Sequence, residues 1–509
     1  MLVGVVLWIA SLSLYLSTLA PTLTWGWDGK AVDGGELLAA ANTLGIPHPP
    51  GYPTYTMLLK AFATLVPIGD FAYRGNLLSA ILASSSVIAV YWVTLRFCRS
   101  LKPEAPAALA TTGAALGSAI FATSPLFWSQ AVVTEVYTLN ALFAGALLVI
   151  AARLALPRQA SLPPSIGRWL TLFGFLLGTG LGNHLTLLAV AVPLLIWLWS
   201  ALGWRKLASP WMIAAFIVGI SVYAYLPIRA AQDPPVNWGN AESLKGVAWM
   251  LTARPYQDYL FGVLPGTIPT RLVSWTELVF SQFNPLGLFF GLMAIGPLRS
   301  RAPNFFFPAL GSIAVISVYT IFYNTVDFEV LMVPAFLFFS VWVGIGFFWI
   351  IATWVRDFAD SLTVLWKSDL RIHTSHQVLV LGLLAFFLLP GMAVILNYGS
   401  QNLRNDRTAY EHAKGILDTT PDGSVLLSTD EKDVFSLWYM RHVEMPERDI
   451  AVIAVPLLQF NWYLNNIHQM YPDRIPAMNA SGFPEALRRI VEHNDGGARV
   501  LFTFKSSAL

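Results

Sequence analysis

The sequence is poor in charge and nearly free of cysteine. Only 12% of its 509 residues are Asp, Glu, Lys or Arg, whereas 56% are hydrophobic; soluble domains carry about 25% charged residues. This deficit indicates that lipid is the main solvent. The single cysteine, Cys98, excludes an internal disulfide framework and a cysteine-based zinc site. Lys and Arg (31) nearly balance Asp and Glu (29), so the basic face that binds nucleic acid is lacking.

A secretory cleavage signal is also lacking. Residues 1–20 have no basic segment before their apolar run, so they are predicted to remain as a membrane span. A span needs about 20 apolar residues. Further apolar runs that predict spans lie at 76–97, 107–124, 138–155, 169–200, 210–228, 285–298, 304–322, 331–354 and 377–396.

The basic residues of the short loops predict the orientation, because such loops stay in the cytoplasm. The run 169–200 has basic residues on both flanks, Arg168 and Arg205 among them, so both of its ends are expected to be cytoplasmic. It is therefore predicted to be a hairpin that turns near 178–186. The result is an α-helical polytopic membrane protein with about eleven transmembrane helices, a cytoplasmic N-terminus and an extracytoplasmic C-terminus.

The predicted membrane domain, residues 1–396, has long outer loops at 21–75 and 229–284. The tail, 397–509, follows on the extracytoplasmic side, and its short apolar runs alternate with helical patterns, which predicts a small α/β domain with parallel strands. Asp430 is expected either to cap the helix after the first strand or to bind a ligand at the sheet edge. Strands are predicted at 424–429, 450–458 and 499–504, and helices at 431–442, 459–471 and 483–494.

The first outer loop holds the densest chemistry, in "DGGELLAAANTLGIPHPPGYP" (33–53). Asp33 and Glu36 are three residues apart. This spacing fits a capping box for a helix at 34–44, and it also fits a pair of functional carboxylates. The two glycines between them are poor helix formers, which indicates that backbone lies close to another segment.

A rigid turn follows that helix. Prolines before and after His48 and Tyr52 fix the backbone, ahead of a helix predicted at 54–66. The turn is either a plain re-entry bend or a support that positions these two polar side chains.

Four segments resemble a known family. They are "DGGELLAAANTLGIPHPPGYPTYTMLLKAF", "AVVTEVYTLNALF", "YLPIRAAQDPPVNWGN" and "STDEKDVFSLWYMRHVEMPERDIAVI". Together they resemble a multispan membrane family that is related to the animal transmembrane protein O-mannosyltransferases. The resemblance implies a GT-C-like fold, a polyprenyl-phosphate sugar donor and an acidic base in the first outer loop. It implies Asp33 as that base and Glu36 as the second acid, whereas the sugar and the acceptor do not transfer.

Sugar transfer of this kind needs a base and groups that stabilise the leaving phosphate. With an ordinary pKa of about 4, Asp33 would be ionised. Arg229 is the favoured phosphate ligand, although an interfacial arginine can also reach toward water, and Arg74 is the second candidate. His48 would donate to the phosphate or orient the acid, and His184 either faces the cavity or belongs to a plain polar turn.

Two further pairs are candidate substrate-binding residues. Glu135 and Tyr137 lie in a predicted outer turn, where Thr134 is a candidate cap for the next helix. Asn237 and Trp238 lie in the second long loop, and tryptophan either stacks on sugars or anchors a membrane interface.

Asp327 and Glu329 would add acid to the cavity or face water. A divalent cation is compatible with these carboxylates, but no spacing dictates a metal site. The resemblance thus implies transfer of a sugar, a hexose such as mannose, to an extracytoplasmic acceptor, which is a protein Ser/Thr, a glycan or a lipid, by an inverting or a retaining route. The alternatives are a membrane transporter and a membrane receptor or scaffold without catalysis.

Overall fold

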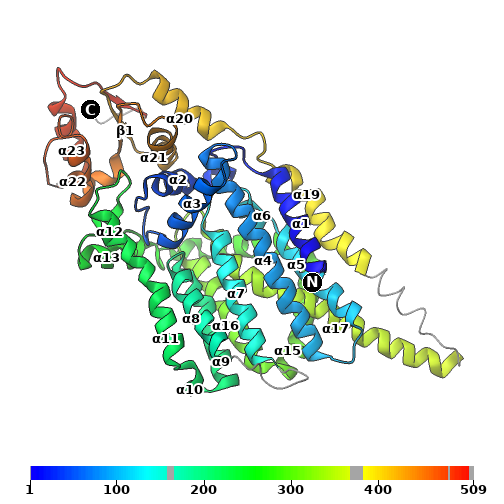
Figure 1. Cartoon of the computed structure of the whole chain (residues 1–509). Helices are drawn as coiled ribbons and strands as arrows, with labels where there is room; N and C mark the ends of the chain where they lie inside the picture. The colour runs from blue at the N-terminus through cyan, green and yellow to red at the C-terminus, as the bar shows by residue number, and fades with distance from the viewer. Residues whose placement is uncertain (1, 157–165, 367–381, 480–481, 504–509) are drawn as a thin grey trace.

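The computed structural model of the chain describes residues 2–156, 166–366, 382–479 and 482–503. Most of these residues are helical, and long helices form a bundle that carries a smaller unit of helix and sheet at one end (Figure 1). The helices of the first long loop, α2 (Asp33–Thr43) and α3 (Pro53–Leu65), lie between the bundle and that unit.

The bundle contains the predicted membrane spans. Among the described residues, eight helical stretches are long and apolar enough to cross a membrane, and a bent pair of helices, with an angle of 65° between them, makes a ninth. With two shorter apolar helices, these make eleven stretches, which correspond to the ten predicted runs because the run 169–200 contains two of them; residues 377–381 of the last run lie outside the described residues. The helices are α1 (Leu2–Thr18), α4 (Phe71–Leu101), the bent pair α5 (Ala107–Thr123) and α6 (Pro125–Ala131), α7 (Tyr137–Ala155), α8 (Ile166–Leu181), α9 (Leu188–Leu202), α11 (Pro210–Ile220) with α12 (Tyr225–Ala230), α14 (Ile268–Met293) with α15 (Ile295–Arg301), α16 (Pro303–Phe322), α17 (Val333–Trp366) and α19 (Met392–Gln401).

Small residues let helices in the bundle approach closely. A Cβ atom on Gly113 of α5 would lie 2.7 Å from the carbonyl oxygen of Gly344 in α17, and one on Gly117 would lie 2.5 Å from that of Ser340. Small residues four apart are a common way to bring two membrane helices into backbone contact.

The predicted hairpin in the run 169–200 is confirmed. The chain leaves α8 at Leu181 and enters α9 at Leu188, with the 3-10 helix η2 (Leu185–Leu187) in the turn between them. Its polar residues, among them His184, are therefore held at the end of the bundle.

One span begins earlier than predicted. The apolar run suggested a start at 285, whereas α14 begins at Ile268 and bends at Asn284, where φ is 49° and ψ is 172°. Polar residues such as Glu277 hide the first half of this helix from a search for apolar runs. The loop predicted at 229–284 is correspondingly shorter, and it contains η4 (Trp238–Asn240), α13 (Leu244–Leu251) and η5 (Arg254–Tyr259).

The tail has the predicted alternation of strands and helices. Three parallel strands form a sheet in the order β2 (Ala451–Ala454), β1 (Val425–Ser428), β3 (Val500–Phe502). Asp430 caps α21, because its carboxylate accepts a 2.9 Å hydrogen bond from the Lys432 backbone N–H. The helices are α20 (Thr408–Thr419), α21 (Glu431–Tyr439), α22 (Asn461–Met470) and α23 (Phe483–His493).

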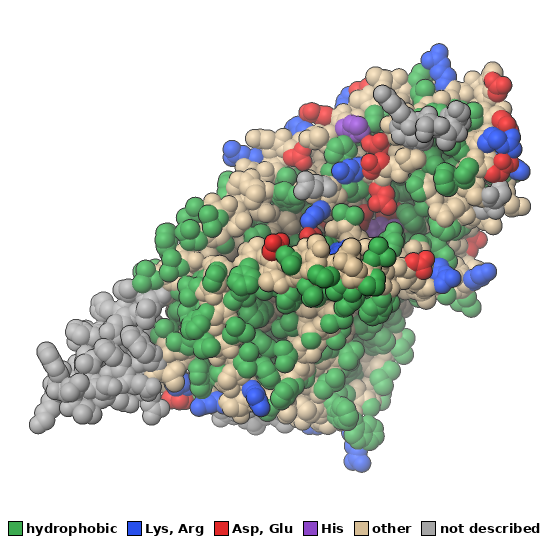
Figure 2. Space-filling model, turned by 180° about the vertical axis from the view of Figure 1, so that it is seen from behind, with side chains coloured by type: hydrophobic (Ala, Val, Ile, Leu, Met, Phe, Trp, Pro, Cys, Tyr) green, Lys and Arg blue, Asp and Glu red, His purple; other side chains and the backbone are tan. Residues whose placement is uncertain are grey.

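The two ends of the bundle differ in character. The first-loop helices and the sheet lie at one end, and the short basic segments α10 (Trp204–Leu207) and α15 lie at the other (Figure 1). Hydrophobic side chains cover the flank between them, and charged side chains gather toward the ends (Figure 2). This is the surface of a multi-pass membrane protein.

Candidate active site

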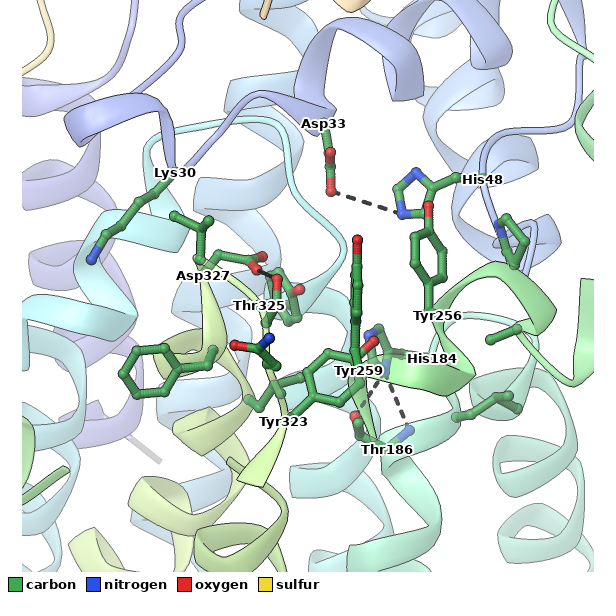
Figure 3. Close-up of a pocket in the computed structure, with 18 of the residues that line it drawn as sticks. Lys30, Asp33, His48, His184, Thr186, Tyr256, Tyr259, Tyr323, Thr325 and Asp327 are labelled. Atoms are coloured by element: carbon green, nitrogen blue, oxygen red, sulfur yellow. Dashed lines mark hydrogen bonds and ion pairs between the residues drawn. The ribbon is translucent and has the colours of Figure 1, made fainter. Parts of the chain in front are cut away.

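A cavity of about 1120 Å³ opens where the bundle meets the first-loop helices and the C-terminal unit. Seven separate parts of the chain line it: the first loop, the start of α7, the turn before α9, η5, α14, the C-terminal end of α16 with the loop that follows, and the start of α21. Figure 3 shows Asp33 pointing into this space, with His48 on one side and Asp327 on the other.

The cavity extends from a polar region to an apolar one. Leu188 and Ala189 line it from the first turn of α9, and Val315 and Ile316 line it from α16. Val315 lies about two turns inside the end of α16 at Phe322. The space therefore reaches between two membrane-spanning helices.

Asp33 is the first residue of α2, and its side chain is 36% exposed, toward the cavity. The predicted capping box is wrong, because the residue at the N-cap is Val32 and no side chain caps this helix. The paired glycines have the predicted role. A Cβ atom on Gly35 would lie 2.6 Å from the carbonyl oxygen of Phe435, so only glycine lets α21 pack directly on α2.

Glu36 lies one turn further along α2, fully buried, and contacts His48. Its Oε2 atom accepts a hydrogen bond from the His48 backbone N–H at 3.3 Å and lies 2.5 Å from the ring nitrogen Nδ1. The other ring nitrogen, Nε2, lies 3.0 Å from the Tyr52 hydroxyl and 3.8 Å from Oδ2 of Asp33. The proline-rich turn thus places one imidazole between two carboxylates.

The surroundings change the proton affinity of both partners. Although the Asp33 side chain is exposed to the cavity, the protein surrounds it, and this burial raises its pKa to about 7; the charge of His48 opposes this rise, and Asp327, Glu36 and Glu431 add to it. The ordinary value expected for this carboxyl from the sequence is therefore wrong. Burial lowers the pKa of His48, but the charges of Glu36 and Asp33 outweigh it and raise the value to about 10.

The turn before α7 lies behind these residues. Glu135 is only 4% exposed, and burial raises its pKa. Thr134 does not cap α7 as predicted: its hydroxyl donates to Oδ1 of Asn76 at 2.8 Å, and the N-cap is Val136. Tyr137 lines the cavity.

His184 lines the cavity as well, with its ring between those of Tyr52 and Tyr137. Its Nδ1 atom accepts a hydrogen bond from the Thr186 backbone N–H at 3.2 Å. Burial, helped by the charge of His48, lowers the pKa of His184 to about 4. This histidine is neutral at pH 7, in contrast to His48.

Neither predicted phosphate ligand lines the cavity. The Arg229 guanidinium donates to the carbonyl oxygens of Leu44 at 2.6 Å and Thr43 at 3.2 Å, so it caps the C-terminal end of α2. Arg74 donates to the carbonyl oxygens of Ala63 at 2.9 Å and Gly69 at 3.0 Å. Both arginines donate to backbone carbonyl oxygens at helix ends and in loops. The sequence alone cannot distinguish such an arginine from one that binds a phosphate.

Asn237 and Trp238 are also outside the cavity lining. Trp238 is 7% exposed, and its ring packs 6.2 Å from that of His48 and 5.8 Å from that of Trp462. The Asn237 carbonyl accepts from the Asn466 side chain at 2.9 Å. The "NWG" motif therefore joins the first loop to the C-terminal unit.

Several lining residues gave no sequence signal. Arg271 of α14 lies over the Phe328 ring, 4.0 Å from its centroid, and its Nη2 atom donates to the Thr325 carbonyl at 3.3 Å. Its buried Nη1 atom has no hydrogen-bond partner among the residues that the structure describes. The other unpredicted lining residues include Lys30, which pairs with Glu329 at 2.9 Å, and Tyr256, Tyr259, Tyr319, Tyr323, Glu431 and Lys432.

Asp327, one of the acids considered from the sequence, lines the cavity and accepts from the Thr325 hydroxyl at 2.7 Å. Within the described ranges, no three or more His, Cys, Asp and Glu side chains are grouped to hold a metal ion.

Comparison with solved structures defines the class of fold. The structure is similar to ArnT from Cupriavidus metallidurans bound to undecaprenyl phosphate, with a TM-score of 0.53 and 14% identity, over 88% of this chain and 89% of that one. It is also similar to the Archaeoglobus fulgidus oligosaccharyltransferase in complex with Zn and sulfate, with a TM-score of 0.54 and 12% identity, over 89% and 62%. The chain is a polytopic membrane protein with a GT-C-like fold.

The sequence comparisons are more specific. Residues 33–208 match the family model of the Protein O-mannosyl-transferase TMEM260 N-terminal domain, and residues 409–482 match that of the TMEM260-associated domain 2. The chain is 24% identical to Protein O-mannosyl-transferase TMEM260 of Mus musculus over 466 residues, and 24% identical to Protein O-mannosyl-transferase tmem260 of Dictyostelium discoideum over 498. The chain is thus similar in sequence to TMEM260 proteins, most specifically in these two segments.

These two alignments cover 89% and 90% of this chain. The chain spans 63% of the length of the mouse relative and 58% of that of the Dictyostelium relative. Both matched family models include walls of the cavity, α2 in the first and α21 in the second.

Proposed function

We propose that the protein is a glycosyltransferase that moves a hexose, such as mannose, from a polyprenyl-phosphate carrier to a Ser or Thr hydroxyl of an exported protein. The observation that carries this proposal is the position of Asp33, at the polar end of a cavity whose other end reaches between α9 and α16. Relatives named as protein O-mannosyl-transferases support the reaction, and a similar fold that binds undecaprenyl phosphate supports a lipid carrier.

The cavity suits a donor with a lipid tail and a polar head. The apolar side chains of α9 and α16 would contact the prenyl chain, and the tyrosines at the ends of η5 and α16 provide hydroxyl donors at the level of the head group. Arg271 is our candidate for the phosphate, because a guanidinium pairs with two phosphate oxygens and its Nη1 atom is buried without a partner in the described chain.

The proposed reaction is a single displacement. The acceptor hydroxyl oxygen attacks the anomeric carbon and forms the new glycosidic bond, while the bond from that carbon to the carrier phosphate breaks. The electron pair of the broken bond leaves with the phosphate, and Asp33 takes the hydroxyl proton. The anomeric centre is inverted. A base with a pKa near 7 is well suited to this step, since it is ionised in part at neutral pH yet binds a proton firmly.

The proposed orientation places the cavity and the C-terminal unit on the extracytoplasmic side. Basic residues in α10 and α15 lie at the opposite end of the bundle, where the positive-inside rule expects the cytoplasm. An exported acceptor would then reach the donor from the extracytoplasmic side of the cavity.

The test is transfer by the purified protein in lipid nanodiscs. Polyprenyl-phosphate hexoses carrying a radiolabel are supplied with peptides rich in Ser and Thr, and label in the peptide is measured. Replacing Asp33 with Asn is expected to lower the rate by about 10²–10⁴-fold, the usual contribution of a general base. Asp433→Asn is the matched control. Asp433 belongs to α21, which lines the cavity, but its own side chain pairs with His412 outside the cavity.

Equal rates in the wild type and the Asp33→Asn variant would refute the role of Asp33 as base. Absence of peptide labelling with every hexose, together with movement of the labelled lipid or sugar across a sealed vesicle, would instead favour transport.

A further inference from the structure

The His48 side chain lies against both acids of α2. Its Nδ1 atom lies 2.5 Å from the fully buried Glu36 carboxylate, and its Nε2 atom lies 3.8 Å from Asp33, which faces the cavity. A carboxylate that is buried completely is costly unless a charged partner compensates it. The short Nδ1 contact and the bond from the His48 backbone N–H supply that partner on one oxygen of Glu36.

Aromatic rings surround the imidazole. The ring centroids of Tyr52, Trp238 and Tyr256 lie 5.1, 6.2 and 6.1 Å from that of His48, all with steep angles between the rings. This enclosure leaves the His48 side chain only 11% exposed, on its cavity side, and strengthens the interaction of the ring with both carboxylates.

We propose that Glu36 is a positioning residue that holds His48 as an imidazolium, and that this buried cation sets the proton affinity of Asp33 at the cavity surface. The inference rests on the proposed role of Asp33 as base. In this arrangement Glu36 never contacts the substrate. It fixes the ring through Nδ1 so that the Nε2 side, with the Tyr52 hydroxyl, faces Asp33.

The charged groups around the pair come from four elements. His48 interacts with Glu36 and Asp33 of α2 and with Glu135 of the turn before α7. Asp33 interacts with His48 and Glu36, with Asp327 beyond α16, and with Glu431 at the start of α21. Among the charged neighbours of Asp33, His48 has the largest effect and is the one that lowers its pKa.

These opposing effects mean that the direction of the pKa shift of Asp33 in a Glu36→Gln variant tests the proposal. If Glu36 keeps His48 charged, Glu36→Gln neutralises the ring, and Asp33 loses its favourable partner. An opposite charge at such a distance lowers a carboxyl pKa by about 1–3 units, so the acid limb of kcat/KM is expected to move upward by about that amount. If His48 instead stays charged without Glu36, the variant only removes a repulsive neighbour, and the limb moves downward.

A first experiment reads the charge of His48 without any activity. Diethyl pyrocarbonate modifies neutral imidazole but not imidazolium, and mass spectrometry locates the modified residue. At pH 7 we expect His184 to react in every folded sample, because it is neutral and lines the same cavity. His48 is expected to be protected in the wild type and modified in Glu36→Gln. Equal protection of His48 in both proteins would overturn the proposal.

A second experiment uses pH profiles of transfer for Glu36→Gln, His48→Gln and the double variant. The two single changes are expected to raise the midpoint of the acid limb of kcat/KM by similar amounts. The double variant is expected to raise it no further, since both changes act through the charge of His48. Glu36→Asp is expected to restore the wild-type midpoint in part. Additive shifts, or a downward shift in Glu36→Gln, would refute the coupling. If Glu36→Gln fails to fold, an unchanged or lowered midpoint in His48→Gln refutes it alone.

The two proposals fail in different ways. If Asp33 is not the base, transfer survives Asp33→Asn, but the modification of His48 by diethyl pyrocarbonate still differs between the wild type and Glu36→Gln. If Glu36 does not hold His48 as an imidazolium, His48 is modified equally in the wild type and Glu36→Gln, or the midpoint of the pH profile moves downward, in a protein whose transfer still depends on Asp33.

Discussion

The pH dependence of transfer tests the environment of Asp33 directly. Burial raises the pKa of this carboxyl from 3.8 to about 7, against the opposing charge of His48 and with the help of Asp327. Since only the ionised form accepts a proton, the active fraction increases from about 9% at pH 6 to about 91% at pH 8. We therefore expect kcat/KM to rise about tenfold over this interval, with a midpoint near neutrality.

The assay measures initial rates at acceptor concentrations well below KM, because kcat/KM reports the ionisation of the free enzyme. The protein is held in nanodiscs from pH 5.5 to 8.5, and its monodispersity is checked at each end. Asp327→Asn is the informative variant: this carboxylate raises the pKa of Asp33 by repulsion, so its removal is expected to lower the midpoint.

A carboxyl with an ordinary pKa of about 4 would give a flat profile between pH 6 and 8, since it is almost fully ionised throughout. A flat profile in the wild type, or a midpoint that rises in Asp327→Asn, would refute the reasoning from burial and charge. A rise of about tenfold that disappears with Asp33→Asn would support it.

Three further predictions concern packing, donor binding and orientation. Gly35→Ala is expected to destabilise the fold by about 1–3 kcal/mol in thermal unfolding, because its Cβ would lie 2.6 Å from a carbonyl of α21, whereas Gly415→Ala, with nothing within 4 Å, is neutral or stabilising. Arg271→Gln is expected to raise the KM for the lipid donor about tenfold or more with little change in kcat. Cysteines introduced at Lys206 in α10 and Lys245 in α13 are expected to react with an impermeant maleimide from opposite sides of the membrane. The single native cysteine is buried, so it should add little background labelling.

The membrane part of the fold could be predicted because lipid imposes a length on every span. The hairpin in 169–200 followed from the charges on its flanks, and the turn at 182–187 agrees with it. The start of α14 could not be found in the same way. Glu277 and its polar neighbours interrupt the apolar run, so the start of this helix at Ile268 becomes visible only in the structure.

The part of the site that lies in one short segment could be predicted as a group. Asp33, Glu36, His48 and Tyr52 are joined by a helix and a stiff turn, so their proximity is a local property of the sequence. Arg229 could not be assigned, because its partners are carbonyl groups of the distant α2 helix.

The same limit explains the residues that were missed or misplaced. Trp238 was a candidate for sugar stacking, yet Trp462 of the C-terminal unit packs on it and buries it. Arg271 and Glu431 have no local pattern at all. They enter the cavity only because α14 and α21 are brought there by the fold.

The C-terminal unit forms part of the cavity wall through the start of α21. Gly35 lets the backbone of α21 lie against α2, and this contact brings Glu431 within electrostatic reach of Asp33. Under the proposed function, the base must meet a donor held by the membrane helices and an acceptor that arrives from water. A carboxylate clamped between the bundle and a water-facing unit satisfies both needs, and it follows that a change at the α2–α21 contact should alter the pH dependence of the base along with the stability of the fold.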